Sequence, residues 1–142
     1  MKTEELTEIR KGHSTQIAIR WDELDPNGHV NNKNFQGYLD EARMRAMRDW
    51  GFSMEKLKTQ SFGPVILSIQ LDFKREINYP ETILIESDLF LKTATRAVFQ
   101  QKIICQSNQM VSCNASTDWV ILNLNSKRPA KFLEAIGLEK PV

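Results

Sequence analysis

The most chemically capable stretch of the sequence runs from Asp25 to Asn32 and reads Asp-Pro-Asn-Gly-His-Val-Asn-Asn. It places a carboxylate, an imidazole and three carboxamides immediately before a segment with helical character. The Asp25 carboxylate could attack a carbonyl carbon itself or take a proton from an attacking water. The unpaired N–H groups of a helix N-terminus could polarise the same carbonyl. These residue types in this order indicate hydrolysis of a polarised carbonyl compound.

The same residues carry a strong turn signal, so a structural interpretation stays open. Asp25 suits the first position of a type I turn, Pro26 and Asn27 the central positions, and Gly28 the last. An aspartate at that first position commonly accepts hydrogen bonds from the backbone of its own turn. His29 could be an ordinary loop histidine, and the following asparagines could cap the start of a helix. The residues alone do not separate a site from a turn.

A long amphipathic segment, about Lys33 to Trp50, must position this loop. Its apolar residues recur every three or four positions and predict one buried stripe, made of Phe35, Tyr38, Leu39, Ala42, Ala46, Met47 and Trp50. The charged residues of the segment, Arg43 among them, are expected mainly outside that stripe. Glu41 and Arg45 lie four positions apart, which allows an ion pair. Gly51 is expected to end the helix.

Strands are expected on both sides of this helix. Alternation from Ser14 to Trp21 predicts a first strand, and a short helix or turn near 53–59 precedes the rest. Alternating apolar positions then predict four further strands, at 65–73, 83–91, 97–105 and 110–124. A last helical turn is expected from Arg128–Pro129 to Gly137. The order predicts an α+β domain in which about five antiparallel strands pack on one long central helix.

Length and composition narrow the function classes. The 142 residues suffice for one domain, 1–142, and the formal charge of +1 gives no electrostatic argument for nucleic acid or a membrane surface. The charged N-terminus lacks the apolar core of a signal peptide, and no run approaches the roughly 18 apolar residues of a membrane span. Cys105 and Cys113 have no metal-ligand spacing and are expected to be buried free thiols, which suits a cytoplasmic location.

One helix on an antiparallel sheet leaves edge strands and one sheet face uncovered. Pairing with a second copy of the chain is the natural remedy, so we expect a homo-oligomer, either a dimer or a dimer of dimers. Neither a Gly-x-Ser-x-Gly elbow nor an HExxH motif is present, which argues against serine-dependent and zinc-dependent routes to hydrolysis.

The element order and the Asp25 loop together resemble the hotdog-fold thioesterases, over roughly Thr15 to Leu124. The similarity is greatest to the 4-hydroxybenzoyl-CoA thioesterase-like family and is carried, beyond the loop, by Phe35, Tyr38, Glu41, Ala42 and Arg43. Acyl-carrier-protein thioesterases of this fold carry Asp-x-Asn-x-His at the same place, which matches Asp25, Asn27 and His29. Those longer enzymes fuse two hotdog repeats, whereas this chain has one. Any cooperation between repeats must therefore come from a partner subunit.

The resemblance implies a sheet wrapped around the helix, paired protomers and active sites at their interface. It implies hydrolysis of an acyl thioester, of coenzyme A or of acyl carrier protein, without a cofactor, since coenzyme A is part of the substrate. Asp25 is expected to act as general base or nucleophile, and the backbone N–H near Asn32 to polarise the thioester carbonyl. Asn27 and His29 are expected to position water or substrate.

For the remaining candidate residues, a functional and a structural interpretation are both considered. Lys92 and Arg96 could meet the phosphates of coenzyme A, and Thr93 and Thr95 its pantetheine arm, or the four could belong to a solvated hairpin. A second hotdog lineage uses a helix glutamate for catalysis, but for Glu41 an ion pair is favoured. The remaining alternative to an enzyme is a hotdog module that binds acyl thioesters or lipids without turnover, or that serves assembly.

Overall fold

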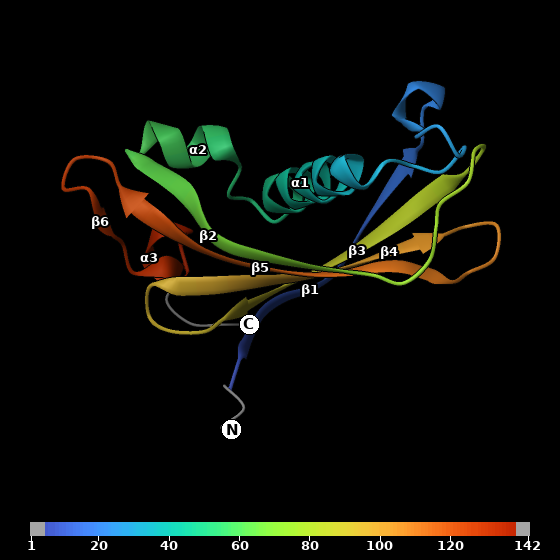
Figure 1. Ribbon diagram of the computed structural model, residues 1–142. Helices are drawn as coiled ribbons and strands as arrows, with labels where there is room; N and C mark the ends of the chain where they lie inside the picture. The colour runs from blue at the N-terminus through green and yellow to red at the C-terminus, as the bar shows by residue number, and fades with distance from the viewer. Residues whose placement is uncertain (1–4, 139–142) are drawn as a thin grey trace.

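The chain folds into a strongly curved antiparallel sheet that carries its longest helix on the concave side (Figure 1). The computed structural model describes residues 5–138; residues 1–4 and 139–142, with the start of the charged N-terminal segment, lie outside the described residues. The five long strands are paired in the order β1-β3-β4-β5-β2. Their bounds are β1 (Thr7–Ala18), β2 (Phe62–Phe73), β3 (Thr82–Leu91), β4 (Arg96–Cys105) and β5 (Val111–Asn123). The antiparallel α+β sheet expected from the sequence is thereby confirmed.

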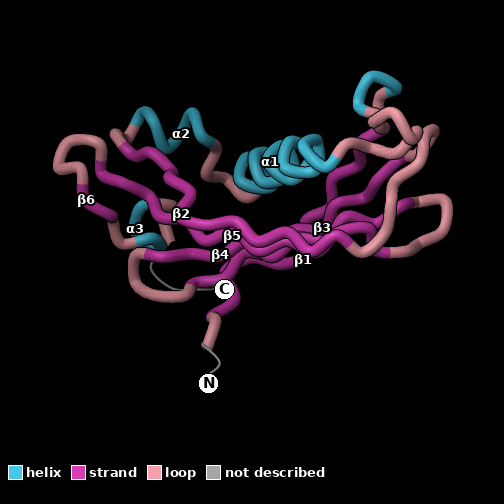
Figure 2. The backbone as a smooth tube through the Cα atoms, in the orientation of Figure 1, coloured by secondary structure: helices cyan, strands magenta, loops and turns pink. Residues whose placement is uncertain are grey.

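Helix α1 (Asn32–Asp49) lies across the sheet and supplies much of the core (Figure 2). Asn31 caps its start by accepting a hydrogen bond from the Lys33 N–H at 3.2 Å. Gly51 follows its end with a φ of +97°, a conformation that glycine adopts without strain. The predicted apolar stripe is buried from Phe35 to Met47, and Trp50 is half-buried.

One residue of α1 departs from the expectation. Arg43 was expected outside the stripe but is only 5% exposed. The reason is geometric: position 43 follows Leu39 by one helical turn and precedes Met47 by one, and both of those side chains are fully buried. Arg43 therefore lies on the flank of the stripe that faces the sheet.

Several segment boundaries predicted from the sequence are wrong. The first strand begins at Thr7, seven residues before the expected Ser14, because its early residues also pair with β3. The first strand ends at Ala18, and Trp21 begins a short 3-10 helix, η1 (Trp21–Glu23), where its side chain is 73% exposed. The Glu23 carboxylate accepts the Arg20 N–H at 2.6 Å and so turns the chain away from the strand direction. Pro129 does not begin a helix; Arg128–Pro129 forms the short strand β6, in which Pro129 pairs with Leu122.

The shorter helices close the open end of the sheet, opposite to η1 (Figure 1). They are α2 (Met54–Thr59), which Ser53 caps, and α3 (Phe132–Ala135). At this end Phe99 stacks on Trp119 with ring centroids 5.5 Å apart, and Trp119 meets Phe132 edge to face at 5.0 Å. A second buried cluster, around Tyr38, Ile77 and Ile83, supports the N-terminal half of α1. Among the described residues, no helix is long and apolar enough to cross a membrane.

Candidate active site

The loop that precedes α1 is a closed, hydrogen-bonded turn that presents Asp25. The Gly28 N–H donates to the Asp25 carbonyl at 3.0 Å, and the Asp25 N–H donates to the His29 carbonyl at 2.6 Å. Leu24 and Val30 form a β-bridge that joins the two ends of the loop. The φ of Gly28 is +81°, which explains why glycine closes the turn. The turn predicted from the sequence is present.

The Asp25 carboxylate uses its two oxygens differently. Oδ1 accepts the N–H groups of Asn27 at 2.8 Å and His29 at 3.1 Å. No hydrogen bond or ion pair to Oδ2 is formed within the part of the chain that the structure describes. The side chain is half-buried. One oxygen therefore fixes the carboxylate in place, and the other is available to a water or a substrate.

The His29 imidazole points to a residue that the sequence did not suggest. Its Nε2 lies 3.1 Å from Oε2 of Glu76, in the connection between β2 and β3. The N–H of Val30 donates to the Ile77 carbonyl at 2.9 Å, and His29 forms a β-bridge with Asn78. His29 thus contributes its backbone N–H to Asp25 and its ring to Glu76. The side chain of Asn27 is exposed, and only its N–H contacts Asp25.

The N-terminus of α1 offers an open donor. The Lys33 N–H is taken by the Asn31 side chain, and the Asn34 N–H by the Asn31 carbonyl at 2.9 Å. For the Asn32 N–H there is no acceptor among residues 5–138. Since this group lies at the positive end of an 18-residue helix, it is suited to bind a carbonyl oxygen or an oxyanion.

Glu23, which precedes the Asp25 loop in the chain, connects η1 to the start of α1 by hydrogen bonds. Its carboxylate accepts the Tyr38 hydroxyl at 2.8 Å, and its carbonyl accepts the Asn31 N–H and the Asn34 side-chain amide, each at 2.9 Å. Burial and the Glu23 carboxylate raise the pKa of Tyr38 well above its ordinary value. This contact could not be predicted from the sequence, because the alternation up to Trp21 suggested a continuing strand.

The predicted coenzyme A residues lie far from this loop within one chain. The β3–β4 hairpin that holds them is at the opposite end of β3, and ten strand residues span roughly 30 Å. Lys92 forms an ion pair with Asp118 at 2.9 Å, and the Thr93 hydroxyl accepts the N–H groups of Arg96 and Thr95 at 3.0 and 3.4 Å. The hairpin interpretation of these residues therefore has direct support, and their contact with coenzyme A stays a prediction.

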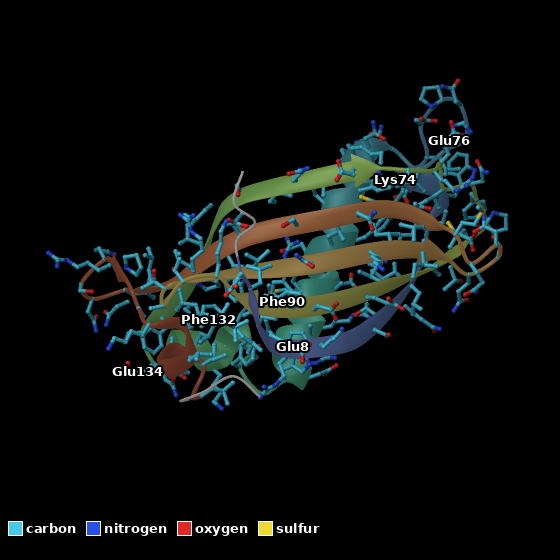
Figure 3. The ribbon with its side chains drawn as sticks, turned by 90° about the horizontal axis from the view of Figure 1, so that it is seen from below. Glu8, Lys74, Glu76, Phe90, Phe132 and Glu134 are labelled. Carbon is cyan, nitrogen blue, oxygen red and sulfur yellow. The ribbon has the colours of Figure 1, made fainter. Side chains whose placement is uncertain are left out.

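Two basic residues are nearer to the Asp25 loop. Lys74 and Arg75 directly precede Glu76, the partner of His29, and both are exposed. Figure 3 shows Lys74 and Glu76 at one end of the sheet, with Phe132 and Glu134 at the other. Glu41 is exposed and forms an ion pair with Arg45, as favoured from the sequence.

Comparison with known proteins defines the class. Residues 19–137 match the model of the thioesterase-like superfamily, and the chain belongs to that family. The chain is 24% identical over 114 residues to the long-chain acyl-CoA thioesterase FadM of Escherichia coli, which covers 80% of this chain and 86% of that one. The family and the thioesterase class predicted from the sequence are thereby confirmed.

Solved structures support the same fold. The DHNA-CoA thioesterase of Staphylococcus aureus superposes with a TM-score of 0.78 at 20% identity, over 87% of this chain and 82% of that one. The protein SAV2348 of Staphylococcus aureus, solved in complex with CoA, gives a TM-score of 0.81 at 12% identity, over 90% of this chain and 80% of that one. The curled antiparallel sheet is that of the hotdog-fold thioesterases.

Proposed function

We propose that the protein hydrolyses an acyl-CoA thioester to a carboxylic acid and free coenzyme A, with Asp25 as the reactive carboxylate. The observation that carries this proposal is the free Oδ2 of Asp25 in a loop that leads, within seven residues, to the open N–H of Asn32. A base or nucleophile and an oxyanion donor are the two parts that acyl transfer needs.

Asp25 could act by either of two routes, as a general base or as a nucleophile. As a base, Asp25 takes a proton from water, the hydroxide adds to the carbonyl carbon, and the tetrahedral intermediate expels the thiolate, which takes the proton back. As a nucleophile, Asp25 forms a mixed anhydride and expels the thiolate, and water then cleaves the anhydride. In either route the oxyanion accepts a hydrogen bond from the Asn32 N–H. His29, held by Glu76, and Asn27 are assigned to positioning of water or substrate.

Pairing of two copies through β2 completes the proposed site. β2 is an edge strand without a charged side chain from Phe62 to Leu71, and Val65, Ile66 and Leu67 are 40%, 47% and 46% exposed. An exposed apolar edge of this kind is a template for another strand. A two-fold axis makes such pairing antiparallel, so each Asp25 loop lies beside the opposite end of the second copy.

Coenzyme A is favoured over acyl carrier protein as the carrier. The relatives that share this fold include proteins named for CoA thioesters and one solved with CoA. In the proposed dimer, the basic pair Lys74 and Arg75 of one copy and the Lys92–Arg96 hairpin of the other lie toward the same end. Both are suited to the phosphates of the nucleotide.

A cytoplasmic location completes the proposal, since acyl-CoA pools and reduced thiols are found there.

The test is a substrate screen followed by one substitution. Acyl-CoAs of varied chain length and matching acyl carrier protein thioesters are incubated with the protein, and thiol release is read with a thiol-reactive dye. Asp25→Asn is expected to lower kcat/KM for the best substrate by about 10²–10⁴-fold, because the carboxamide can neither take the proton nor attack. Asp22→Asn, three residues away in η1 and exposed, is the matched control and should retain wild-type activity.

Two results contradict the proposal. A folded, oligomeric Asp25→Asn protein that hydrolyses the best substrate at the wild-type rate removes Asp25 from the chemistry. Saturable binding of acyl-CoAs without thiol release from any of them shows a binding module instead of an enzyme.

A further inference from the structure

A small cavity lies beneath the C-terminal half of α1. Its volume is about 120 Å³, and it opens between α1, α2 and the strands β2, β4 and β5. Its apolar wall is formed by Met44, Met47, Met54, Ile66, Phe99 and Trp119. Methionine side chains are flexible and adapt to varied apolar shapes. For comparison, a cavity of about 150 Å³ in another protein holds one benzene molecule, so this one suits a short chain or a single ring.

The polar part of the wall is Arg43 with Thr117. Nη1 of Arg43 lies 3.1 Å from Oε1 of Gln101 and 3.4 Å from the Thr117 hydroxyl. The one ion-pair partner that the described residues give Arg43 is Asp40, at 3.4 Å, and the Asp40 side chain is 61% exposed. Burial lowers the pKa of the guanidinium from its ordinary value, although arginine stays charged. The positive charge of Arg43 is therefore buried in the wall of the cavity, and the exposed Asp40 carboxylate neutralises it only weakly.

A second donor stands in the same wall without an acceptor. The indole N–H of Trp119 is buried and has no hydrogen-bond partner among the described residues. Buried donors of this kind are uncommon in proteins, and each costs stability until an acceptor arrives. The wall therefore combines an apolar lining with unsatisfied donor capacity, a combination that favours a ligand with an oxygen acceptor.

The cavity does not face Asp25 of its own chain. Arg43 follows Asn32 by eleven positions, which is about 16 Å along the helix axis. Antiparallel pairing of two β2 strands, however, brings the cavity of one copy near the Asp25 loop of the other copy. Ile66, in the first half of β2, lines the cavity, whereas Phe73, at its end, packs on Phe35 in the first turn of α1 with ring centroids 5.1 Å apart. In the antiparallel dimer each cavity therefore lies beside the second copy's α1 N-terminus.

We propose that this cavity is the acyl pocket, and that Arg43 selects acyl groups that carry a hydrogen-bond-accepting oxygen away from the thioester. The proposal rests on the thioesterase function proposed above and names the substrate class of that site. Arg43 is the specificity-determining residue, and Thr117 orients it. The acyl group is short or has a single ring, and its distal oxygen is a hydroxyl or a carboxylate.

The test uses pairs of acyl-CoAs in which a methyl group replaces oxygen at nearly constant shape. The hydroxyl pairs are 3-hydroxybutyryl-CoA with 3-methylbutyryl-CoA, and 4-hydroxybenzoyl-CoA with 4-methylbenzoyl-CoA. The carboxylate pair is glutaryl-CoA with 5-methylhexanoyl-CoA. In at least one pair the wild-type kcat/KM is expected to be about tenfold or more higher for the oxygen-bearing member. The pair with the largest ratio identifies which kind of oxygen is bound.

Arg43→Met removes the donors and keeps a side chain of similar length. It should abolish the ratio chiefly by raising KM for the oxygen-bearing member, and should lower kcat/KM for the methyl member much less. Arg45→Met, on the same helix and half-exposed, is the matched control and should leave the ratio unchanged. If Arg43→Met does not fold, Thr117→Val takes its place and should reduce the ratio, because the hydroxyl is a partner of the guanidinium.

Subunit mixing tests the placement of the pocket. A heterodimer of one Asp25→Asn chain and one Arg43→Met chain contains one wild-type site only if each site combines Asp25 of one copy with Arg43 of the other. Mixing should then restore oxygen-selective hydrolysis to about half of the wild-type level per dimer, by this count of sites.

The outcomes separate the two proposals. If wild-type protein hydrolyses acyl-CoAs but shows no preference for oxygen in any pair, the pocket assignment is wrong and the thioesterase function stands. An equal loss on both members of each pair in Arg43→Met would mean a structural role for Arg43 and would also overturn it. If no acyl-CoA is hydrolysed at all, the proposed function itself fails.

Discussion

At the residue scale, the two interpretations of Asp25 turn out to be compatible. The turn occupies Oδ1 through the N–H groups of Asn27 and His29, and Oδ2 remains available. A carboxylate held by its own loop loses little freedom when a substrate binds, which is the advantage of preorganisation. The contact of the His29 ring with Glu76 also holds the Asp25 carboxylate in place, since a fixed ring keeps the His29 backbone N–H in position.

The two cysteines make a prediction that bears directly on the activity assay. Burial raises the pKa of Cys113 to about 11 and also raises that of Cys105, whose Sγ lies 3.2 Å from the Ser112 hydroxyl. A raised thiol pKa means less thiolate at pH 8, and thiolate is the reactive form. Native protein is therefore expected to give no reaction with a thiol-reactive dye at pH 8, and two equivalents after unfolding in guanidinium.

The exposed variant Ser126→Cys is the positive control for that measurement and should add one rapidly reacting equivalent. Fast labelling of native wild-type protein would contradict the burial of both thiols. Confirmation would also mean that the dye signal in the substrate screen comes from the thiol released by the substrate and not from the protein's own cysteines.

At the scale of elements, local periodicity predicted most of the architecture, and tertiary contacts decided the rest. The stripe on α1 and the alternation in β2 to β5 appear in the sequence because each arises from neighbours in the chain. Trp21 was misplaced because a hydrogen bond to Glu23 competes with a continuing strand. Arg43 was misplaced because its partners, Gln101 and Thr117, are more than fifty positions away. The Asp25 turn was predictable, and its attachment to Glu76 was not.

The contact between η1 and α1 carries the next prediction. Tyr38→Phe removes the hydroxyl that donates to Glu23, and should lower the free energy of unfolding by about 1–2 kcal/mol, because a half-buried carboxylate loses a donor. It should also lower kcat several-fold, since Glu23 holds both the Asn31 N–H and the Asn34 side chain at the helix start. Chemical denaturation and steady-state kinetics measure the two effects.

Tyr79→Phe is the matched control, because that ring is 46% exposed and lies in the β2–β3 connection. It should change neither quantity. A Tyr38→Phe protein with wild-type stability would show that the hydroxyl contributes nothing to the loop. Glu23→Gln combined with Tyr38→Phe should be less destabilising than the sum of the two single changes, as expected of two groups in one contact.

At the scale of the whole molecule, the two edges of the sheet differ in a way that favours one of them for the proposed assembly. β1 is charged at Glu8, Arg10 and Lys11 and its pairing with β3 is interrupted twice, near Arg10. Charge and irregular pairing discourage the addition of another strand. β2, at the other edge, is apolar over most of its length and interrupted once, near Leu67. The proposed site needs a second copy at this edge, because the Arg43 cavity and the Asp25 loop of one chain lie too far apart.

Leu67→Lys should therefore separate the subunits and inactivate the protein together. A lysine at the centre of the apolar edge places two like charges near the two-fold axis of the proposed dimer, and their desolvation opposes pairing. Light scattering should report a monomer with an intact fold, and kcat/KM should fall by more than about tenfold, because an isolated chain keeps Asp25 but has no acyl pocket beside it. Gln16→Lys adds the same charge to the exposed surface of β1 and should leave both the oligomer and its activity intact. A Leu67→Lys monomer with full activity would place the entire site within one chain and would overturn the shared pocket while leaving the role of Asp25 in place.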